Sequence, residues 1–251
     1  MRVPGVFLIC GFLLAGFGAR GQQPTQDTVG KIEKTWSWGV ESDFSSKYLW
    51  KGITYNEGLL IQPSLWASCG KFSAGLWGNY VAYDRFHSEK VHEVDLIFTY
   101  SYSIGKFEID HTVMFYYYPG LEDAPPTGEF FLGVGYPIGE FSLFSSATAD
   151  FLSYPGNLYF EHGVDYEKEL TEKLLLSTKV SLGWANGHFN ETYIGTTKTS
   201  VNLIGADISL MYTTRGAVYL KPHVQVNRTA SPDLLPFLGK YPWFCGLAIG
   251  I

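Results

Sequence analysis

Pairs of acidic residues two positions apart recur in the sequence, and they are the residues best placed to do chemistry. Glu93 is followed by Asp95, and Glu108 by Asp110, with large apolar residues between and around them. Carboxylates at this spacing share one face of an extended chain, because successive side chains of a strand point to opposite faces. Such a face could hold a calcium ion at a rim. Lining of a water-filled passage is the favoured interpretation, because acidic pairs are common on polar strand faces.

The histidines do not form a recognisable catalytic pattern. A hydrolase built on a membrane barrel would need a serine activated by a histidine that a third group orients. No His-x-Ser occurs: His87 is followed directly by Ser88, and His162 is followed by Gly163 and Val164. Gly-rich phosphate loops, Walker patterns and Cys–His zinc spacings are also absent from the sequence. The sequence therefore predicts no enzyme activity and no cofactor.

The acidic pairs belong to segments in which polar and apolar residues alternate. The stretch "EVDLIFTYSYSIGKFEIDHTVMFYYYP" alternates on both sides of "SIGKF", where Gly105 is the expected turn residue. Alternation with a period of two is the signature of a strand, and two such runs around a glycine turn predict a hairpin. Each arm spans roughly ten residues, which is longer than the usual strand of about five or six. Long strands with two different faces indicate a barrel.

Twelve segments of this kind follow one another along the chain. They cover residues 36–48, 59–68, 72–83, 92–102, 107–118, 128–137, 141–152, 158–167, 174–184, 200–212, 217–228 and 241–251. Their connections alternate between short turns and longer loops, which is typical of outer-membrane barrels. No apolar run after the leader is long enough for a transmembrane helix. We therefore expect an all-β fold, an antiparallel up-and-down transmembrane β-barrel of about 12 strands. A soluble barrel with an apolar interior is the alternative.

The alternation assigns the apolar residues to the lipid-facing surface and the aromatic residues at strand ends to the bilayer interfaces. The expected outward set includes Val94, Leu96, Phe98, Phe130, Leu132, Val134, Leu174, Leu176, Val180, Leu182, Val218, Leu220, Val224, Val226, Leu247, Ile249 and Ile251. His111 and His162 fall on the same lipid face. In Ser200–Tyr212 the alternation slips, and a β-bulge near Ile204–Gly205 would repair it.

The opposite face is rich in acids and is expected to line a pore. The predicted pore-lining residues are Glu41, Asp43, Lys47, Glu93, Asp95, Glu108, Asp110, Glu129, Asp150, Glu161, Asp165, Lys179, Asp207 and Lys221. An excess of carboxylates in a narrow lumen gives a negative potential, which favours cations. Glu41, Asp43, Glu108 and Asp110 are expected on adjacent or nearby faces and are the candidates for selectivity. Alternatively, these groups are hydrated rim residues that only keep the lining polar.

The amino terminus predicts the compartment. Arg2, an apolar core over residues 6–17 and a small-residue site that ends at Gly21 or Gly18 form a secretory signal peptide. The expected organisation is a signal peptide at 1–21, a periplasmic tail at 22–35 and an outer-membrane barrel at 36–251. The two cysteines of the mature chain, Cys69 and Cys245, are interpreted as small hydrophobic residues rather than a disulfide.

The first strand carries a recognisable motif within "SDFSSKYLWKGITYNEGLLIQPSL". The motif residues are Ser46, Tyr48, Trp50, Lys51, Gly52 and Ile53. This segment resembles the opening of the TorF-type family of porins, in which S-x-Y-x-W/F-R-G-[IV] precedes a short loop and an apolar strand. "FSAGLWGNYV", "GEFFLGVGYPI" and "NLYFEHGVDY" resemble later family strands in order. Lys51 stands where the family usually has arginine, and the chain ends in Ile251 without the usual terminal aromatic residue. The resemblance implies an outer-membrane barrel that serves as a channel.

Together these features predict a channel in the cell outer membrane for passive diffusion of small polar solutes, with a preference for cations. The expected partners are outer-membrane lipid, the barrel assembly machinery and small polar or cationic solutes. The net charge of −6 gives no basic surface for nucleic acid. The alternative is a non-transport barrel with an adhesive, structural or docking role. A lumen blocked by Trp66, Trp77, Tyr116 and Phe131 would favour that alternative.

Overall fold

The computed structural model describes residues 36–86, 90–122, 124–214, 216–237 and 241–251. The predicted signal peptide (1–21) and periplasmic tail (22–35) lie outside the described residues. No helix in the described ranges is both long enough and apolar enough to cross a membrane.

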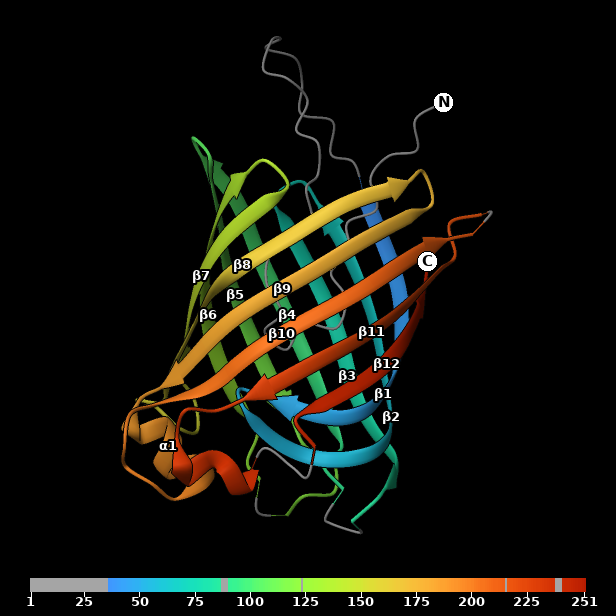
Figure 1. Cartoon of the computed structure of the whole chain (residues 1–251). Helices are drawn as coiled ribbons and strands as arrows, with labels where there is room; N and C mark the ends of the chain where they lie inside the picture. Colours follow the sequence, from blue (N-terminus) through green and yellow to red (C-terminus); the bar gives the residue numbers. More distant parts are fainter. Residues whose placement is uncertain (1–35, 87–89, 123, 215, 238–240) are drawn as a thin grey trace.

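Twelve strands form one closed antiparallel barrel (Figure 1). They are β1 (Trp36–Trp50), β2 (Ile53–Cys69), β3 (Phe72–Asp84), β4 (Glu93–Ile104), β5 (Phe107–Tyr117), β6 (Thr127–Ile138), β7 (Phe141–Asp150), β8 (Leu158–Thr171), β9 (Leu174–Ala185), β10 (Ser200–Thr213), β11 (Tyr219–Arg228) and β12 (Trp243–Gly250). Each strand pairs with its neighbours in sequence, and β1 closes the barrel on β12 from Glu41↔Gly250 to Ser45↔Gly246. The twelve-stranded antiparallel barrel predicted from the alternation is confirmed.

The two ends of the barrel differ in the length of their connections. The turn end holds the tight turns, including those at Gly70, Gly105 and Gly139, together with the start of β1 and the end of β12 (Figure 1). The loop end holds the longer connections. Two of these contain short helices: α1 (Gly187–Ile194) lies between β9 and β10, and the 3₁₀ helix η1 (Pro232–Phe237) lies between β11 and β12.

The wall is apolar outside and polar inside, the reverse of an ordinary soluble domain. In β4, Val94, Leu96 and Phe98 are 38%, 41% and 48% exposed, whereas Glu93 and Asp95 are 3% and 1% exposed. Their side chains alternate because they share one strand, so the apolar set must cover the outer surface. An apolar interior, the alternative considered from the sequence, is not what the fold contains. The outer surface has the character of a lipid-facing one.

The two histidines on the outer face have polar partners. His111 stacks on the ring of Tyr102, with 5.7 Å between centroids, and its Nε2 lies 3.2 Å from the Tyr102 hydroxyl. His162 Nδ1 lies 2.9 Å from the hydroxyl of Ser145, its direct cross-strand neighbour. A hydrogen-bond partner lowers the cost of placing a polar group against an apolar medium.

The bulge in β10 lies at Asn202 and not at Ile204–Gly205, so the predicted position was wrong. Val201 pairs with Trp184 and Leu203 with Gly183, which leaves Asn202 as the additional residue. The Asn202 amide donates to Asn190 Oδ1 of α1 at 2.8 Å, and both residues are fully buried. This contact turns Asn202 inward. Leu203 consequently joins the inner face as well, while Ile204 begins the regular outward alternation.

The two cysteines are free, as expected from the sequence. Cys69 is half-buried at the turn end and Cys245 is exposed on β12.

Candidate functional site: the lumen and its inturned ribbon

Beyond the wall, β1 and β2 continue as a two-stranded ribbon over residues 46–57. The ladder between β1 and β12 ends at Ser45, and the ladder between β2 and β3 ends at Gly58. Within the described residues, the pairs from Lys47↔Glu57 to Trp50↔Ile53 join the ribbon strands only to each other. This stretch was predicted as a loop between strands that ended at 48 and began at 59, so those boundaries were wrong.

A tight turn at Lys51 and Gly52 closes the ribbon. Their φ angles of 50° and 87° are both positive. Two-residue hairpin turns of this hand match the twist of the flanking strands, and glycine favours the second position. The segment "WKGI", noted in sequence for its resemblance to a family motif, is therefore the tip of the ribbon.

The tip reaches across the lumen. Lys51 Nζ forms an ion pair with the Glu129 carboxylate on β6, although β2, β3, β4 and β5 separate β1 from β6 around the barrel. The ammonium also lies 4.3, 5.5 and 5.4 Å from the ring centroids of Trp50, Tyr159 and Phe189. Lys51 is only 3% exposed. Its burial lowers the pKa of the ammonium, and the neighbouring Glu129 carboxylate acts in the opposite direction.

Aromatic packing fixes the ribbon against α1. The Trp50 ring lies 5.5 Å from Phe189 and 5.0 Å from Tyr193, and Tyr159 of the β8 wall packs on Phe189 at 5.7 Å. The buried apolar cluster at this end consists of Tyr48, Trp50, Ile53, Leu60, Trp77, Val81, Tyr159, Ala185 and Phe189. Because it joins the ribbon to β3, β8, β9 and α1, this cluster fills the loop end of the lumen.

Hydrogen bonds hold both edges of the ribbon. The Tyr48 hydroxyl donates to the Glu93 carboxylate, and the Val91 amide donates to Asn56 Oδ1 at 3.0 Å. Lys47 Nζ pairs with Glu57 Oε1 at 3.0 Å and donates to the Tyr241 carbonyl at 2.6 Å. The ribbon thus contacts β4 and the β3–β4 and β11–β12 connections.

Burial of the inward residues falls toward the turn end on β4 and β5, whereas Glu41 and Tyr219 on the β1 and β11 side of that end stay buried. Glu129 and Glu161, near the loop end, are buried, whereas Glu108 and Asp110 on β5 are half-buried and Ser101 on β4 is exposed. We call these regions the loop half and the turn half of the lumen. The ribbon crosses the loop half, and the β4 and β5 side of the turn half is accessible to water.

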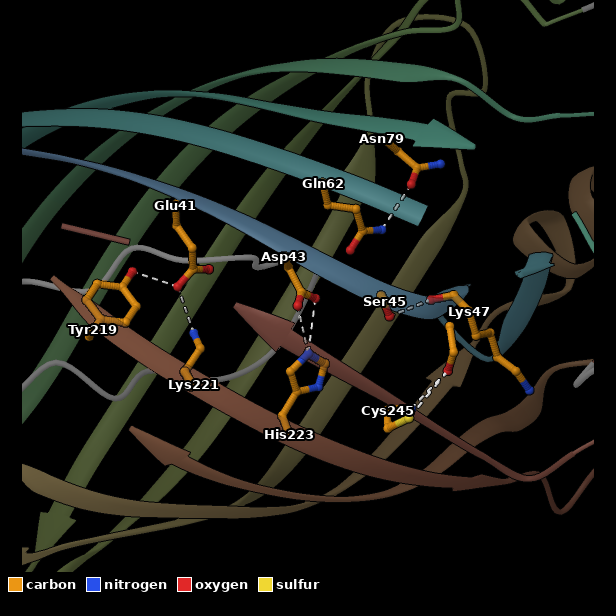
Figure 2. A network of polar contacts seen from close by, with 11 residues as sticks. Glu41, Asp43, Ser45, Lys47, Gln62, Asn79, Tyr219, Lys221, His223 and Cys245 are labelled. Carbon is orange, nitrogen blue, oxygen red and sulfur yellow. Dashed lines mark hydrogen bonds and ion pairs between the residues drawn. The ribbon is translucent and has the colours of Figure 1, made fainter. Parts of the chain in front are cut away.

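A row of polar contacts joins the inner faces of β1 and β11 (Figure 2). Glu41 Oε2 accepts from the Tyr219 hydroxyl at 2.6 Å and pairs with Lys221 Nζ at 3.1 Å. One step along the same strands, Asp43 Oδ1 lies 3.0 Å from His223 Nε2. The strands place these residues together because the inward-facing positions of β1 and β11 pair with the same residues of β12: Glu41 and Tyr219 both pair with Gly250.

These contacts pass over β12, which lies between β1 and β11 in the barrel. The inward positions of β12 include Gly246 and Gly250. A Cβ at Gly246 would lie 2.3 Å from His223 Nε2, and one at Gly250 would lie 2.2 Å from the Tyr219 hydroxyl. The two glycines therefore leave the room in which side chains of β11 reach β1.

On the far wall, Lys179 occupies the centre of an acidic group. It stands directly between Asp165 of β8 and Asp207 of β10 in the strand register, and its Nζ pairs with Glu161 Oε1 at 2.9 Å. Farther toward the loop end, Asp150 accepts from the Thr127 hydroxyl at 2.6 Å.

Several of the predicted pore-lining carboxylates have partners from the protein itself. Lysine partners from the protein lie on Glu41, Glu129 and Glu161, so the net acidity of the lumen is smaller than a count of carboxylates suggests. Asp43 has a hydrogen-bond partner in His223. Glu41 and Asp43 on β1 are not adjacent to Glu108 and Asp110 on β5, because three strands separate them. The two pairs therefore do not lie on adjacent strands, and the expected grouping on adjacent faces was wrong. The predicted up-and-down strand order already implies this separation.

Sequence reasoning missed the buried charges of the ribbon and its base, Lys51, Glu57 and Asp84. The available signal was the Lys-Gly pair flanked by Trp50 and Ile53, which is a hairpin-turn pattern.

Of the residues expected in a blocked lumen, three are buried and one is partly accessible. Trp66, Trp77 and Tyr116 are buried on the inner wall and Phe131 is half-buried, but the group that crosses the lumen is the ribbon. Among the described residues, no group of three or more histidine, cysteine or acidic side chains is arranged to hold a metal ion.

The barrel is similar to solved porin structures. Against "NanC porin structure in rhombohedral crystal form" the TM-score is 0.52 at 9% identity, over 85% of this chain and 98% of that one. "KdgM porin" gives a TM-score of 0.54 at 10% identity, over 84% and 97% of the two chains. "KdgM porin in complex with disordered oligogalacturonate" gives 0.50 at 9% identity, over 86% and 96%. At these identities the likeness establishes the fold.

The sequence comparison with curated proteins gave no match. A family described as "Bacterial protein of unknown function (Gcw_chp)" matches residues 33–225, which include β1 to β10 and most of β11. The chain is a member of this Gcw_chp family and has the fold of a porin-like barrel.

Proposed function

We propose that the chain is a porin-type channel of the outer membrane, which allows passive diffusion of small polar solutes and prefers cations. The observation that carries this proposal is the inversion of the barrel: ionisable side chains line its interior while apolar side chains cover its outside. A protein that needed only an inert anchor would gain nothing from burying so many charged groups, because each carries a desolvation cost. A hydrated conduit gives those groups a role.

The proposed preference for cations rests on the turn half of the lumen. Glu108, Asp110 and Glu167 contribute carboxylates there, and Lys221 and Lys179 are the nearby ammonium groups. A negative confined lumen concentrates cations and excludes anions. The structure of KdgM with oligogalacturonate concerns an anionic ligand. The acidic lumen of this chain is unsuited to such a polyanion, so the proposed solutes are cationic or neutral.

The proposed partners and relationship follow from the same features. Outer-membrane lipid would cover the exposed apolar belt, and the barrel assembly machinery would insert the chain. The ribbon tip is the segment that resembles the TorF-type porins, so we assign the chain to that type. In the proposed orientation, the loop end faces the outside of the cell and the turn end faces the periplasm.

Planar-bilayer recording tests the channel function. Two proteins are compared: the natural chain, and a variant in which Asn-Gly replaces residues 47–57 so that the ribbon is absent. The ribbon-free protein should conduct, and its reversal potential in a salt gradient should move toward the cation side, most strongly at low ionic strength. Absence of conductance in both proteins would contradict a channel.

A non-transport role in adhesion, envelope structure or docking is the second candidate. The observation that favours it is the closed loop half, where the ribbon and α1 fill the lumen. A folded, ribbon-free barrel that never conducts would support this role over the channel.

A further inference from the structure

We propose that the β1–β2 ribbon is a releasable plug, and that the ion pair between Lys51 and Glu129 is the latch that holds it in the lumen. This inference deepens the channel function proposed above and rests on it. In the latched state the ribbon closes the loop half. In the released state it leaves the lumen as a hairpin, and the charged wall becomes a continuous water-filled path.

The ribbon has the connections of a hinged element. Its two strands leave the wall at neighbouring points, because β1 parts from β12 after Ser45 and β2 parts from β3 before Gly58. The register is interrupted between Ser45 and Lys47 and again between Tyr48 and Leu49. β-Bulges bend and twist a strand, and they are the usual means by which a strand turns away from its sheet. The ribbon can therefore swing as a unit while the twelve-stranded wall keeps its pairing.

The contacts of the tip are suited to reversible closure. Trp50 and Ile53 of the ribbon are buried in the apolar cluster, so release of the ribbon would expose their apolar surface to water. A tip that was apolar throughout would be harder still to release. Here the tip presents an ammonium group to a carboxylate, and both are buried. Burying two charges costs desolvation energy that their attraction repays only in part. Release returns water to both groups, so the two states lie closer in free energy than an apolar plug would allow.

Within the described residues, the latch is the ion pair that joins the ribbon tip to the opposite wall, and its surroundings favour a cation there. Asp150 and Glu161 lie near enough to add electrostatic support to the Lys51 ammonium. The rings of Trp50, Tyr159 and Phe189 add cation–π attraction. A negative charge at the tip would meet three carboxylates instead. The sign of the charge at position 51 should therefore decide whether the ribbon stays inside.

Charge reversal and charge exchange test the latch. The variants are Lys51→Glu, Glu129→Lys and the double exchange, which restores an opposite-charge pair. The matched control is Lys168→Met, which removes one partner of an exposed ion pair with Glu140 at the turn end (3.5 Å). The first readout is hydrogen exchange of backbone amides 47–57 in lipid nanodiscs. The second is open probability in planar bilayers.

Each single reversal should raise ribbon exchange by at least about a hundredfold, because it leaves like charges buried together. It should also raise the open probability. The double exchange should return both readouts most of the way toward natural values, and Lys168→Met should change neither. Equal ribbon exchange in all four variants would overturn the latch, even if the natural protein conducts. Ribbon exchange that follows the charges in a protein that never conducts would instead refute the channel and retain the latch.

Discussion

The loop half and the turn half of the lumen use the same alternation of strand residues, but they satisfy buried charge differently. In the loop half, a wall carboxylate is balanced by a cation that reaches across the barrel: Lys51 of the ribbon pairs with Glu129 of β6. In the turn half, the charges are balanced along the wall: Lys221 of β11 meets Glu41 of β1 over the glycines of β12. Transverse pairs close a lumen, whereas pairs along the wall leave its centre open.

This difference indicates which contacts control closure of the lumen and which adjust its ion preference. A transverse contact also brings aromatic packing with it, since Trp50 must be inside for Lys51 to reach Glu129. Breaking a contact along the wall exposes little apolar surface. Changes in the loop half should therefore act on folding and closure, and changes in the turn half should act on ion preference with little effect on stability.

The largest effect is expected for Trp50→Ala. Removal of a buried tryptophan ring typically costs about 3–5 kcal/mol, and here the lost contacts are those to Phe189 and Tyr193. The ribbon amides should lose most of their protection from hydrogen exchange. Trp36→Ala is the control, because that ring is 73% exposed on the outside of the barrel. Equal ribbon exchange in the two variants would mean that the loop half is not packed as described.

Arginine on the inner face should separate the two halves. Thr148 lies on the β7 wall in the loop half and is 2% exposed, whereas Ser101 of β4 is exposed in the turn half. Thr148→Arg overfills a packed region and should cost about 1–3 kcal/mol or more. Ser101→Arg should cost less than about 0.5 kcal/mol. Unfolding from lipid vesicles measures both, and equal penalties would contradict the difference between the halves.

Opposite changes of charge in the turn half should move ion preference in opposite directions. Asp110→Asn removes a negative charge, so the reversal potential in a salt gradient should shift toward the value of an anion-selective pore. Lys221→Met leaves Glu41 without that ammonium, so the shift should be toward the cation side. Asp43→Asn should have a smaller effect than Asp110→Asn, since Asp43 is hydrogen-bonded to His223. Measurements use the ribbon-free protein at low salt, and shifts of the same sign would refute the wall-charge account.

The smallest effect is expected for Gly246→Ala. The new methyl group would displace the His223 ring, the flexible end of a side chain, from Asp43. Stability should fall by about 1 kcal/mol, the low end for overpacking, because the displaced group is the end of a side chain. The reversal potential should change because the Asp43 contact is lost. Gly75→Ala on the inner face of β3 is the control, since its Cβ would meet nothing closer than 3.5 Å. Identical reversal potentials in the two variants would show that Gly246 does not provide the room for that contact.

Local alternation was sufficient to predict the wall from the sequence. Val94, Leu96 and Phe98 must face one side and Glu93 and Asp95 the other, whatever their neighbours are, so strand number and facing follow from the chain alone. The ribbon could not be predicted in the same way. Its position depends on Glu129, which is 78 residues from Lys51 in sequence.

The errors at the lumen have the same origin. The bulge at Asn202 depends on its amide contact with Asn190 of α1, and a contact with a loop helix leaves no periodic trace in the strand. The contacts of Glu41 with Lys221 and of Asp43 with His223 depend on β11 reaching over β12, which requires the closed barrel. Local pattern therefore predicts the faces of the strands, while pairing across the lumen requires the assembled structure.

The central claim is that the ribbon closes the loop half of the lumen, and a reversible tether tests it most directly. The protein carries Lys51→Met, which weakens the latch, and Cys69→Ser with Cys245→Ser, which remove the native thiols. The tether is a disulfide between Asn56→Cys on the ribbon and Val91→Cys on the β3–β4 connection. In the natural protein the Asn56 side-chain oxygen and the Val91 backbone amide are 3.0 Å apart. Single-channel conductance is recorded with the new disulfide oxidised and then reduced in the same bilayer. We expect the oxidised protein to remain closed and the reduced protein to open. Equal conductance in both states would contradict closure by the ribbon.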